Sequence, residues 1–113
     1  MNELSLVDAL ALELSVDPVA AEQVIDGSPQ TGLWESDSEE WGVWEMTSGV
    51  MSDVEVDEFF VVIAGEGTLE RTVGGVVTTT ALRPGVVCRL SEGEQTVWRV
   101  TAPLRKVYWV PTT

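Results

Sequence analysis

The sequence predicts an all-β fold, a small β-barrel preceded by a short N-terminal helix or arm. From residue 33 onward, short apolar segments alternate with turn signals at intervals of roughly 8–12 residues, as in sandwiches and barrels. Gly74-Gly75 separates two segments rich in β-branched residues and marks a tight hairpin. The run 61–64 is continuously apolar before Gly65, which is typical of a strand buried on both faces.

Residues 1–30 are predicted to form the helix or arm, and residues 31–113 the barrel. Ser5 and Asp8 have the spacing of a capping box, and Asp17-Pro18 would end the helix. Between them, helical spacing is followed by Leu6, Val7, Leu10, Ala11 and Leu14.

The barrel strands are predicted from alternating or continuous apolar segments, each bounded by turn residues. These segments are 33–36, 41–46, 52–64, 68–73, 76–81, 86–90, 96–100 and 104–110. Gly65-Glu66-Gly67 is expected to be a tight turn, and Thr101-Ala102-Pro103 a break between the last two strands.

The charge excludes several classes of partner. There are 19 acidic residues against 6 basic ones in 113 residues, a net charge of −13. Without a lysine and arginine patch, nucleic acid and anionic membrane surfaces are not expected partners. A single cysteine, Cys88, allows no internal disulfide and fits a reducing compartment. The first residues carry acids rather than a basic region, so we expect no secretory signal and a cytoplasmic location.

The absence of histidine limits the possible chemistry. No imidazole base, Ser-His or Cys-His pair, or histidine metal site can form. Acid–base work would depend on carboxylates, Tyr108, Cys88 or Lys106, the only lysine.

Several motifs resemble the cupin family. The run 42–49, followed by Asp57-Glu58 and six residues before Gly65, resembles the first cupin motif. Arg83-Pro84-Gly85, Gly93 and the ending 98–108 resemble the second half. The ending is similar to small single-domain cupins related to ureidoglycine aminohydrolase and the ethanolamine-utilisation cupin. The resemblance implies a double-stranded, jelly-roll-like β-barrel, often dimeric, with a ligand pocket inside one mouth.

The metal-binding cupin pattern is not complete here. It places two histidines before the glutamate, where this chain has Met51 or Ser52 and Asp53 or Val54, and a later histidine near Thr96. Of the four usual ligands the resemblance leaves only Glu58, so we expect no histidine-bound metal and no cofactor. Asp53, Glu55 and Asp57 share one strand face, which suits either a carboxylate-held metal or a solvated strand edge.

Glu58 is the main candidate for function. It shares strand parity with Phe60, so it would be a partly buried carboxylate suited to acid–base work, if that face points inward. Alternatively, it forms a structural pair with Arg89, Arg99 or Arg105.

Further candidates follow from their predicted strands. Trp44 and Trp98 could wall a pocket, and Tyr108 could donate a proton there. Cys88 could face the pocket, although an inert buried thiol is its usual role. Arg105 could hold a carboxylate ligand, since only one of Arg105 and Lys106 can point inward. The candidate set is therefore Glu58 and Tyr108 as catalytic residues, and Trp44, Glu58, Phe60, Cys88, Trp98 and Arg105 as ligand-binding residues.

These features favour a small-molecule-binding protein, expected from the resemblance to be a homodimer. The alternatives are an enzyme acting on a small carboxylate or nitrogenous metabolite, and a dimeric interaction scaffold.

Overall fold

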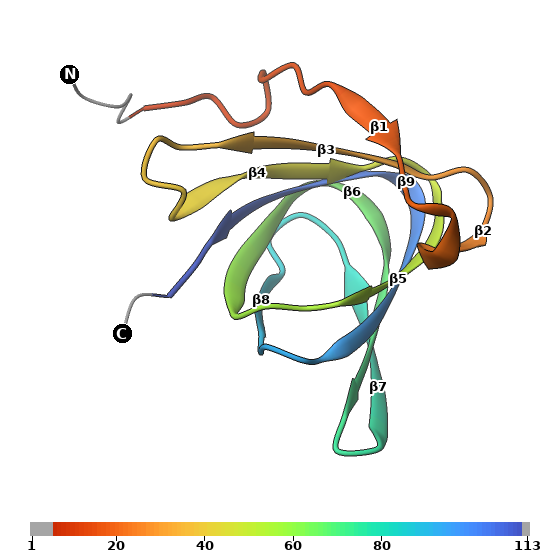
Figure 1. Ribbon diagram of the computed structural model, residues 1–113. Coiled ribbons are helices and arrows are strands. Elements are labelled where there is room, and N and C mark those ends of the chain that lie inside the picture. The colour runs from red at the N-terminus through yellow and green to blue at the C-terminus, as the bar shows by residue number, and fades with distance from the viewer. Residues whose placement is uncertain (1–5, 112–113) are drawn as a thin grey trace.

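The computed structural model describes residues 6–111, which form one strongly curled antiparallel β-sheet (Figure 1). Its strands are β1 (Val16–Pro18), β2 (Val24–Asp26), β3 (Gln30–Glu35), β4 (Trp41–Met46), β5 (Gly49–Val54), β6 (Glu58–Val73), β7 (Val76–Leu82), β8 (Val87–Leu90) and β9 (Gln95–Trp109). One 3₁₀ helix, η1 (Ala21–Gln23), precedes β2. The prediction of an all-β barrel is confirmed.

The two longest strands, β6 and β9, pair with each other and connect the two parts of the curled sheet. The first half of β9 pairs with β5 and its second half with β4. The opposite edge of β9 pairs with β6 along most of its length, while β6 also pairs with β7 and β8. Because both long strands bend, one sheet wraps around a single interior.

The bend lies where a turn and a strand break were predicted, and both predictions were wrong. The register of β6 against β9 shifts between Val62 and Gly67. Gly65 has φ of +92°, and a Cβ at this position would collide with the carbonyl oxygen of Pro103. Glycine therefore allows the two backbones to approach within the sheet, and the strands kink there rather than end.

The predicted N-terminal helix is also absent from the described residues. The Asp8 carboxylate accepts hydrogen bonds from the amides of Leu10 (3.1 Å) and Ala11 (3.2 Å), but only one turn follows. The Arg105 guanidinium binds the carbonyls of Ala9 (2.8 Å) and Leu12 (2.7 Å), which would otherwise accept helical hydrogen bonds. The segment then extends into β1, which pairs with β3. The proposed cap Ser5 lies outside the described residues.

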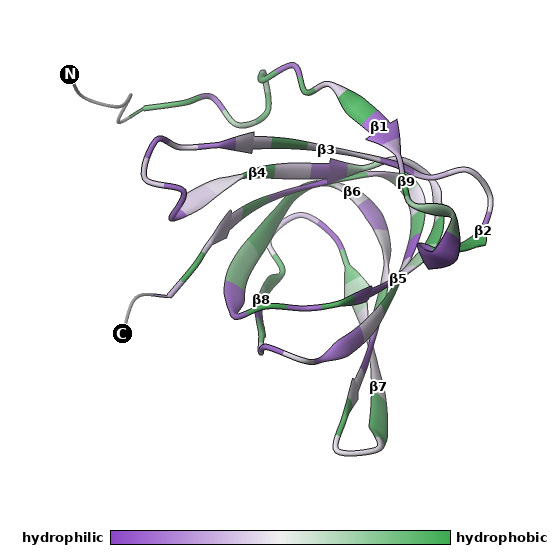
Figure 2. Ribbon diagram, viewed as in Figure 1, coloured by the Kyte–Doolittle hydropathy of each residue, from purple (hydrophilic) through white to green (hydrophobic). Residues whose placement is uncertain are grey.

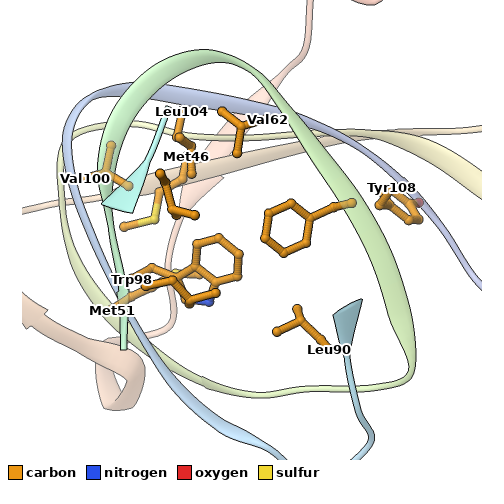
Figure 3. Close-up of a cluster of buried hydrophobic side chains, with 11 residues drawn as sticks. Met46, Met51, Val62, Leu90, Trp98, Val100, Leu104 and Tyr108 are labelled. Atoms are coloured by element: carbon orange, nitrogen blue, oxygen red, sulfur yellow. The ribbon is translucent and has the colours of Figure 1, made fainter. Parts of the chain in front are cut away.

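The barrel interior is a continuous apolar core (Figure 3). Trp98 lies at its centre, with only 1% of its surface exposed. Phe60 and Val62 are fully buried, so the face of β6 that also carries Glu58 does point inward. Among residues 6–111, no helix has the length and apolar character needed to cross a bilayer.

Candidate ligand-binding site

A cavity of about 220 Å³ adjoins the apolar core, and buried charged groups converge on it. Side chains from β3, β4, β6, β9 and the end of β5 line it: Leu33, Trp44, Asp53, Glu55, Glu58, Trp98, Lys106 and Tyr108. Leu33 is about half exposed, which gives the cavity an apolar rim at the surface. A larger hollow of about 510 Å³ includes Ser52, Val54, Glu70 and Val97. We favour the smaller cavity because it contains a buried ion pair.

Lys106 and Glu58 form that ion pair. The Lys106 Nζ atom donates to Oε2 of Glu58 at 2.6 Å, and the side chains are only 5% and 13% exposed. Lys106 shares its strand face with Tyr108 and Trp98, because alternate β9 residues point into the barrel. The cation is therefore carried by the same inward face as two aromatic walls.

Three aromatic rings surround the Lys106 ammonium. Its Nζ lies 4.5 Å from the Phe60 ring centroid and 4.7 Å from the centroids of Trp44 and Trp98. Aromatic faces attract cations at these distances. We call these three rings the Lys106 cage; together with Glu58 they stabilise a positive charge that would otherwise be costly to bury.

Glu55 is a second buried carboxylate in the cavity. Its Oε2 accepts hydrogen bonds from the Thr96 hydroxyl (2.6 Å) and the Trp98 indole nitrogen (3.1 Å). Burial raises the pKa of Glu55 above its ordinary value, although these hydrogen bonds and the charge of Lys106 act in the opposite direction. A carboxyl group of this kind can hold or release a proton within the cavity.

Asp53 and Tyr108 complete the polar lining. The Asp53 carboxylate accepts from its neighbouring amide, Val54 N, at 2.8 Å, and from the Gln23 side chain at 3.4 Å. Burial, followed by the nearby charges of Glu35 and Glu58, raises the pKa of Tyr108 to about 12. At neutral pH the Tyr108 hydroxyl therefore stays protonated, and it can form hydrogen bonds with a ligand.

The structure brings most of the predicted site residues together. Trp44, Glu58, Trp98 and Tyr108 line the cavity, and Phe60 contacts it through the Lys106 cage.

Two predicted site residues lie elsewhere. The Arg105 side chain binds Glu45 at 2.7 Å and the N-terminal carbonyls, so Lys106 is the inward cation of this pair. Cys88 pairs with Phe60 across β6 and β8 and packs against the core, where burial raises the pKa of its thiol. Neither residue is part of the cavity lining.

The sequence analysis did not include Lys106 among the candidate site residues, and it did not predict that Glu55 is buried. Glu58 does form a pair, but with Lys106 rather than with any of the three arginines considered. Strand parity could have found the lysine, because Lys106 is two residues from Tyr108 and eight from Trp98. Glu55 follows the buried Met51 by four residues, which gave the same kind of signal.

The residues present do not fit the metal centre that the cupin resemblance implies. The retained glutamate, Glu58, already binds an ammonium group, and Met51 belongs to the apolar core. Asp57 accepts from the Glu92 amide at 2.9 Å, outside the cavity lining. Within residues 6–111, no three carboxylate or thiol groups lie close enough together to hold a metal ion.

Solved structures share this fold. The chain is similar to a protein of unknown function of the DUF861 family from Pseudomonas syringae pv. tomato, with 23% identity and a TM-score of 0.66. The match covers 90% of this chain but only 45% of the Pseudomonas protein, so this chain spans less than half of that relative's length. The EutQ protein of Clostridium difficile is 18% identical, with a TM-score of 0.58 over 90% of this chain and 82% of that one.

A third similar structure is VPA0057 from Vibrio parahaemolyticus, a protein of unknown function. It is 12% identical, with a TM-score of 0.57 over 87% of this chain and 98% of that one. At these identities the structures establish the fold alone. No curated protein matches the sequence. A family model for the EutQ-like cupin domain matches residues 31–108, which is most of the chain. This protein therefore belongs to the EutQ-like cupin family.

Proposed function

We propose that this cupin domain binds a small metabolite that carries a protonated amine or several N–H donors. The observation that supports the proposal is the charge balance of the cavity. Three carboxylates, Asp53, Glu55 and Glu58, face one ammonium group, which Glu58 already pairs. Asp53 and Glu55 have no cationic side chain of their own among the lining residues. The N–H groups of a bound ligand would donate hydrogen bonds to these two carboxylates.

The size and walls of the cavity narrow the ligand further. At about 220 Å³ it is smaller than the usual range for drug-sized ligands, roughly 300–1,000 Å³. Trp44 and Leu33 provide apolar surface next to the carboxylates. The best fit is a compact molecule with a nitrogen group at one end and a short apolar body.

Calorimetric titration against matched small molecules tests this proposal. A panel of short alkylamines, the corresponding alkyl carboxylates and the corresponding alcohols is titrated at neutral pH. We expect binding of the amines, weakened at least about tenfold by Asp53→Asn or Glu55→Gln, because each removes an acceptor charge. Glu92→Gln is the matched control, since Glu92 is exposed and outside the cavity. Binding of carboxylates in preference to amines would contradict the proposal.

An enzymatic function is the second candidate, and Glu55 favours it. A buried carboxyl group with a raised pKa, close to a buried lysine, is the type of group that enzymes use for proton transfer. Incubating any ligand found by titration and following it by NMR distinguishes the two functions. An enzyme would convert the ligand and lose conversion, but not all binding, in Glu55→Gln. A binding protein would leave the ligand unchanged.

A further inference from the structure

Lys106 is the only lysine of the chain, and its amine lies next to a cavity rather than at the outer surface. The side chain is 5% exposed and lines the cavity of about 220 Å³. Lysine is almost never buried in this way unless it is paired. The proposed ligand binding uses the charge of this group but not the chemistry of its nitrogen. A lysine amine is also a nucleophile, which forms Schiff bases with carbonyl compounds.

We propose that Lys106 is a nucleophile that forms a Schiff base with a small aldehyde in the cavity. The Lys106 nitrogen bonds to the aldehyde carbon, and the C=O bond of the aldehyde is replaced by a C=N bond. The ammonium group loses two protons, and both leave with the aldehyde oxygen as one molecule of water. The positive charge stays on the nitrogen, which becomes an iminium ion. The reaction consumes neither an oxidant nor a reductant.

Glu58 is placed to carry these protons from the nitrogen to the oxygen. Its Oε2 atom accepts from the Lys106 Nζ atom at 2.6 Å, so the first proton has an acceptor in direct contact with the attacking nitrogen. Glu55 lines the same cavity and is a second carboxyl group that can hold a proton during the transfer, because burial raises its pKa. The nucleophile and two proton-transfer groups therefore share one cavity.

The Lys106 cage suits the iminium product as well as the free ammonium group. The three ring centroids lie 4.5–4.7 Å from Nζ, and the Glu58 carboxylate is its counter-ion. An iminium ion carries its charge on the same nitrogen, so the rings and Glu58 stabilise it too. The apolar surroundings also limit the access of water, which hydrolyses Schiff bases. Figure 2 shows β6 as hydrophilic at its start, where Glu58 is its first residue, and hydrophobic directly beyond it.

Charge and size define which aldehydes fit the cavity. Its lining holds three carboxylates and one ammonium group, so an aldehyde that carries a negative charge would be repelled. A volume of about 220 Å³ accommodates only a compact molecule. The site therefore suits a short aldehyde that is uncharged or bears an amine. This inference goes beyond the proposed amine binding and does not rest on it, because Schiff-base formation needs only the amine of Lys106.

Reductive trapping in the variant Thr79→Lys tests the proposal. Cyanoborohydride converts a Schiff base into a stable secondary amine, and mass spectrometry of peptides separates the two lysines from the α-amino group of the chain. Thr79 is exposed on β7 and lies opposite Glu70, so the variant supplies an ordinary surface lysine within the same folded protein. With a short alkyl aldehyde we expect Lys106 to be modified at least about tenfold faster than the introduced lysine. This difference should disappear in the urea-unfolded protein.

Two further aldehydes test whether the reaction takes place inside the cavity. A polycyclic aromatic aldehyde is too large for it, and a short aldehyde with a carboxylate has the wrong charge. Both should modify the introduced lysine but not Lys106. Modification of Lys106 by the large aldehyde, or a Lys106 that reacts no faster than the introduced lysine with the short alkyl aldehyde, would overturn the proposal. Neither result would affect the amine titration, so the two proposals fail separately.

Discussion

The Nζ atom of Lys106 lies 2.6 Å from Oε2 of Glu58, inside a cage of three aromatic rings. By its resemblance to the first cupin motif, Glu58 stands where that pattern has a metal-binding glutamate. In this protein it therefore neutralises a side-chain cation of the chain itself. The pair links β6 to β9 next to the core, so it bears on both the stability of the barrel and the charge of the cavity.

Replacing Lys106 by methionine should destabilise the protein by about 3 kcal/mol, since it leaves Glu58 as an unpaired buried charge. Methionine retains similar length and apolar contact with the rings. Urea unfolding followed by tryptophan fluorescence measures the effect. The double variant Glu58→Gln/Lys106→Met should recover part of the loss, because it leaves no buried charge. If the double variant loses as much stability as Glu58→Gln and Lys106→Met together, the pair makes no energetic contribution.

Glu55 should make stability fall as pH rises above 4.5. Its pKa is raised in the folded state, mainly by burial, so the folded protein holds this proton more tightly than the unfolded chain. The favourable contribution is complete below the ordinary pKa of 4.5 and is lost as pH rises through the raised value. Glu55→Gln, which can still accept from Thr96 and Trp98, should remove this part of the pH dependence. Parallel pH curves for the variant and wild type would contradict the assignment.

Glu94 should produce the opposite dependence at lower pH. Its hydrogen bonds from Arg71, at 2.7 and 2.9 Å, lower the pKa of the carboxyl group below 4.5. Its contribution is therefore present above pH 4.5 and is lost as pH falls through the lowered value. Arg71→Met should cost about 2 kcal/mol at neutral pH. It should also reduce the loss of stability on acidification, which acid unfolding of the two proteins can compare.

The strands could be predicted from the sequence because their signals are local. Alternation, β-branched residues and Gly74-Gly75 identify the hairpin of β6 and β7 without knowledge of the rest of the chain. The bend at Gly65 could not be predicted in this way. A glycine needed for a turn and one needed for close backbone approach give the same sequence signal, and only the pairing of β6 with β9 distinguishes them.

The candidate site was predicted in part for a similar reason. Trp44, Glu58 and Trp98 follow from strand parity, but the partner of Glu58 depends on how β6 and β9 cross. The helix was predicted wrongly because Arg105, distant in sequence, binds the backbone carbonyls that the helix would need.

Gly65→Ala should be one of the most damaging single substitutions, with a loss of about 3 kcal/mol or more. The new methyl group would collide with the carbonyl oxygen of Pro103, and the alanine backbone would have to keep a positive φ. Gly74→Ala is the matched control: its φ is also positive, at +57°, but no atom lies within 4 Å of the added Cβ. It should cost only about 1 kcal/mol. Thermal unfolding of both variants separates the collision from the backbone strain, and equal losses would mean that close approach at Gly65 is unimportant.

Tyr108 is the only tyrosine of the chain, so phenolate absorbance reports on it alone. Its pKa of about 12 in the folded protein lies above the ordinary value of 10.0, chiefly because of burial. The contribution to stability that follows from this difference is complete below pH 10 and is lost as pH rises through about 12. An alkaline titration of the native protein should therefore show little phenolate at pH 10, whereas the urea-unfolded protein should be about half ionised there. Coincident titration curves would mean that the Tyr108 ring is freely hydrated and that this side of the cavity is open to solvent.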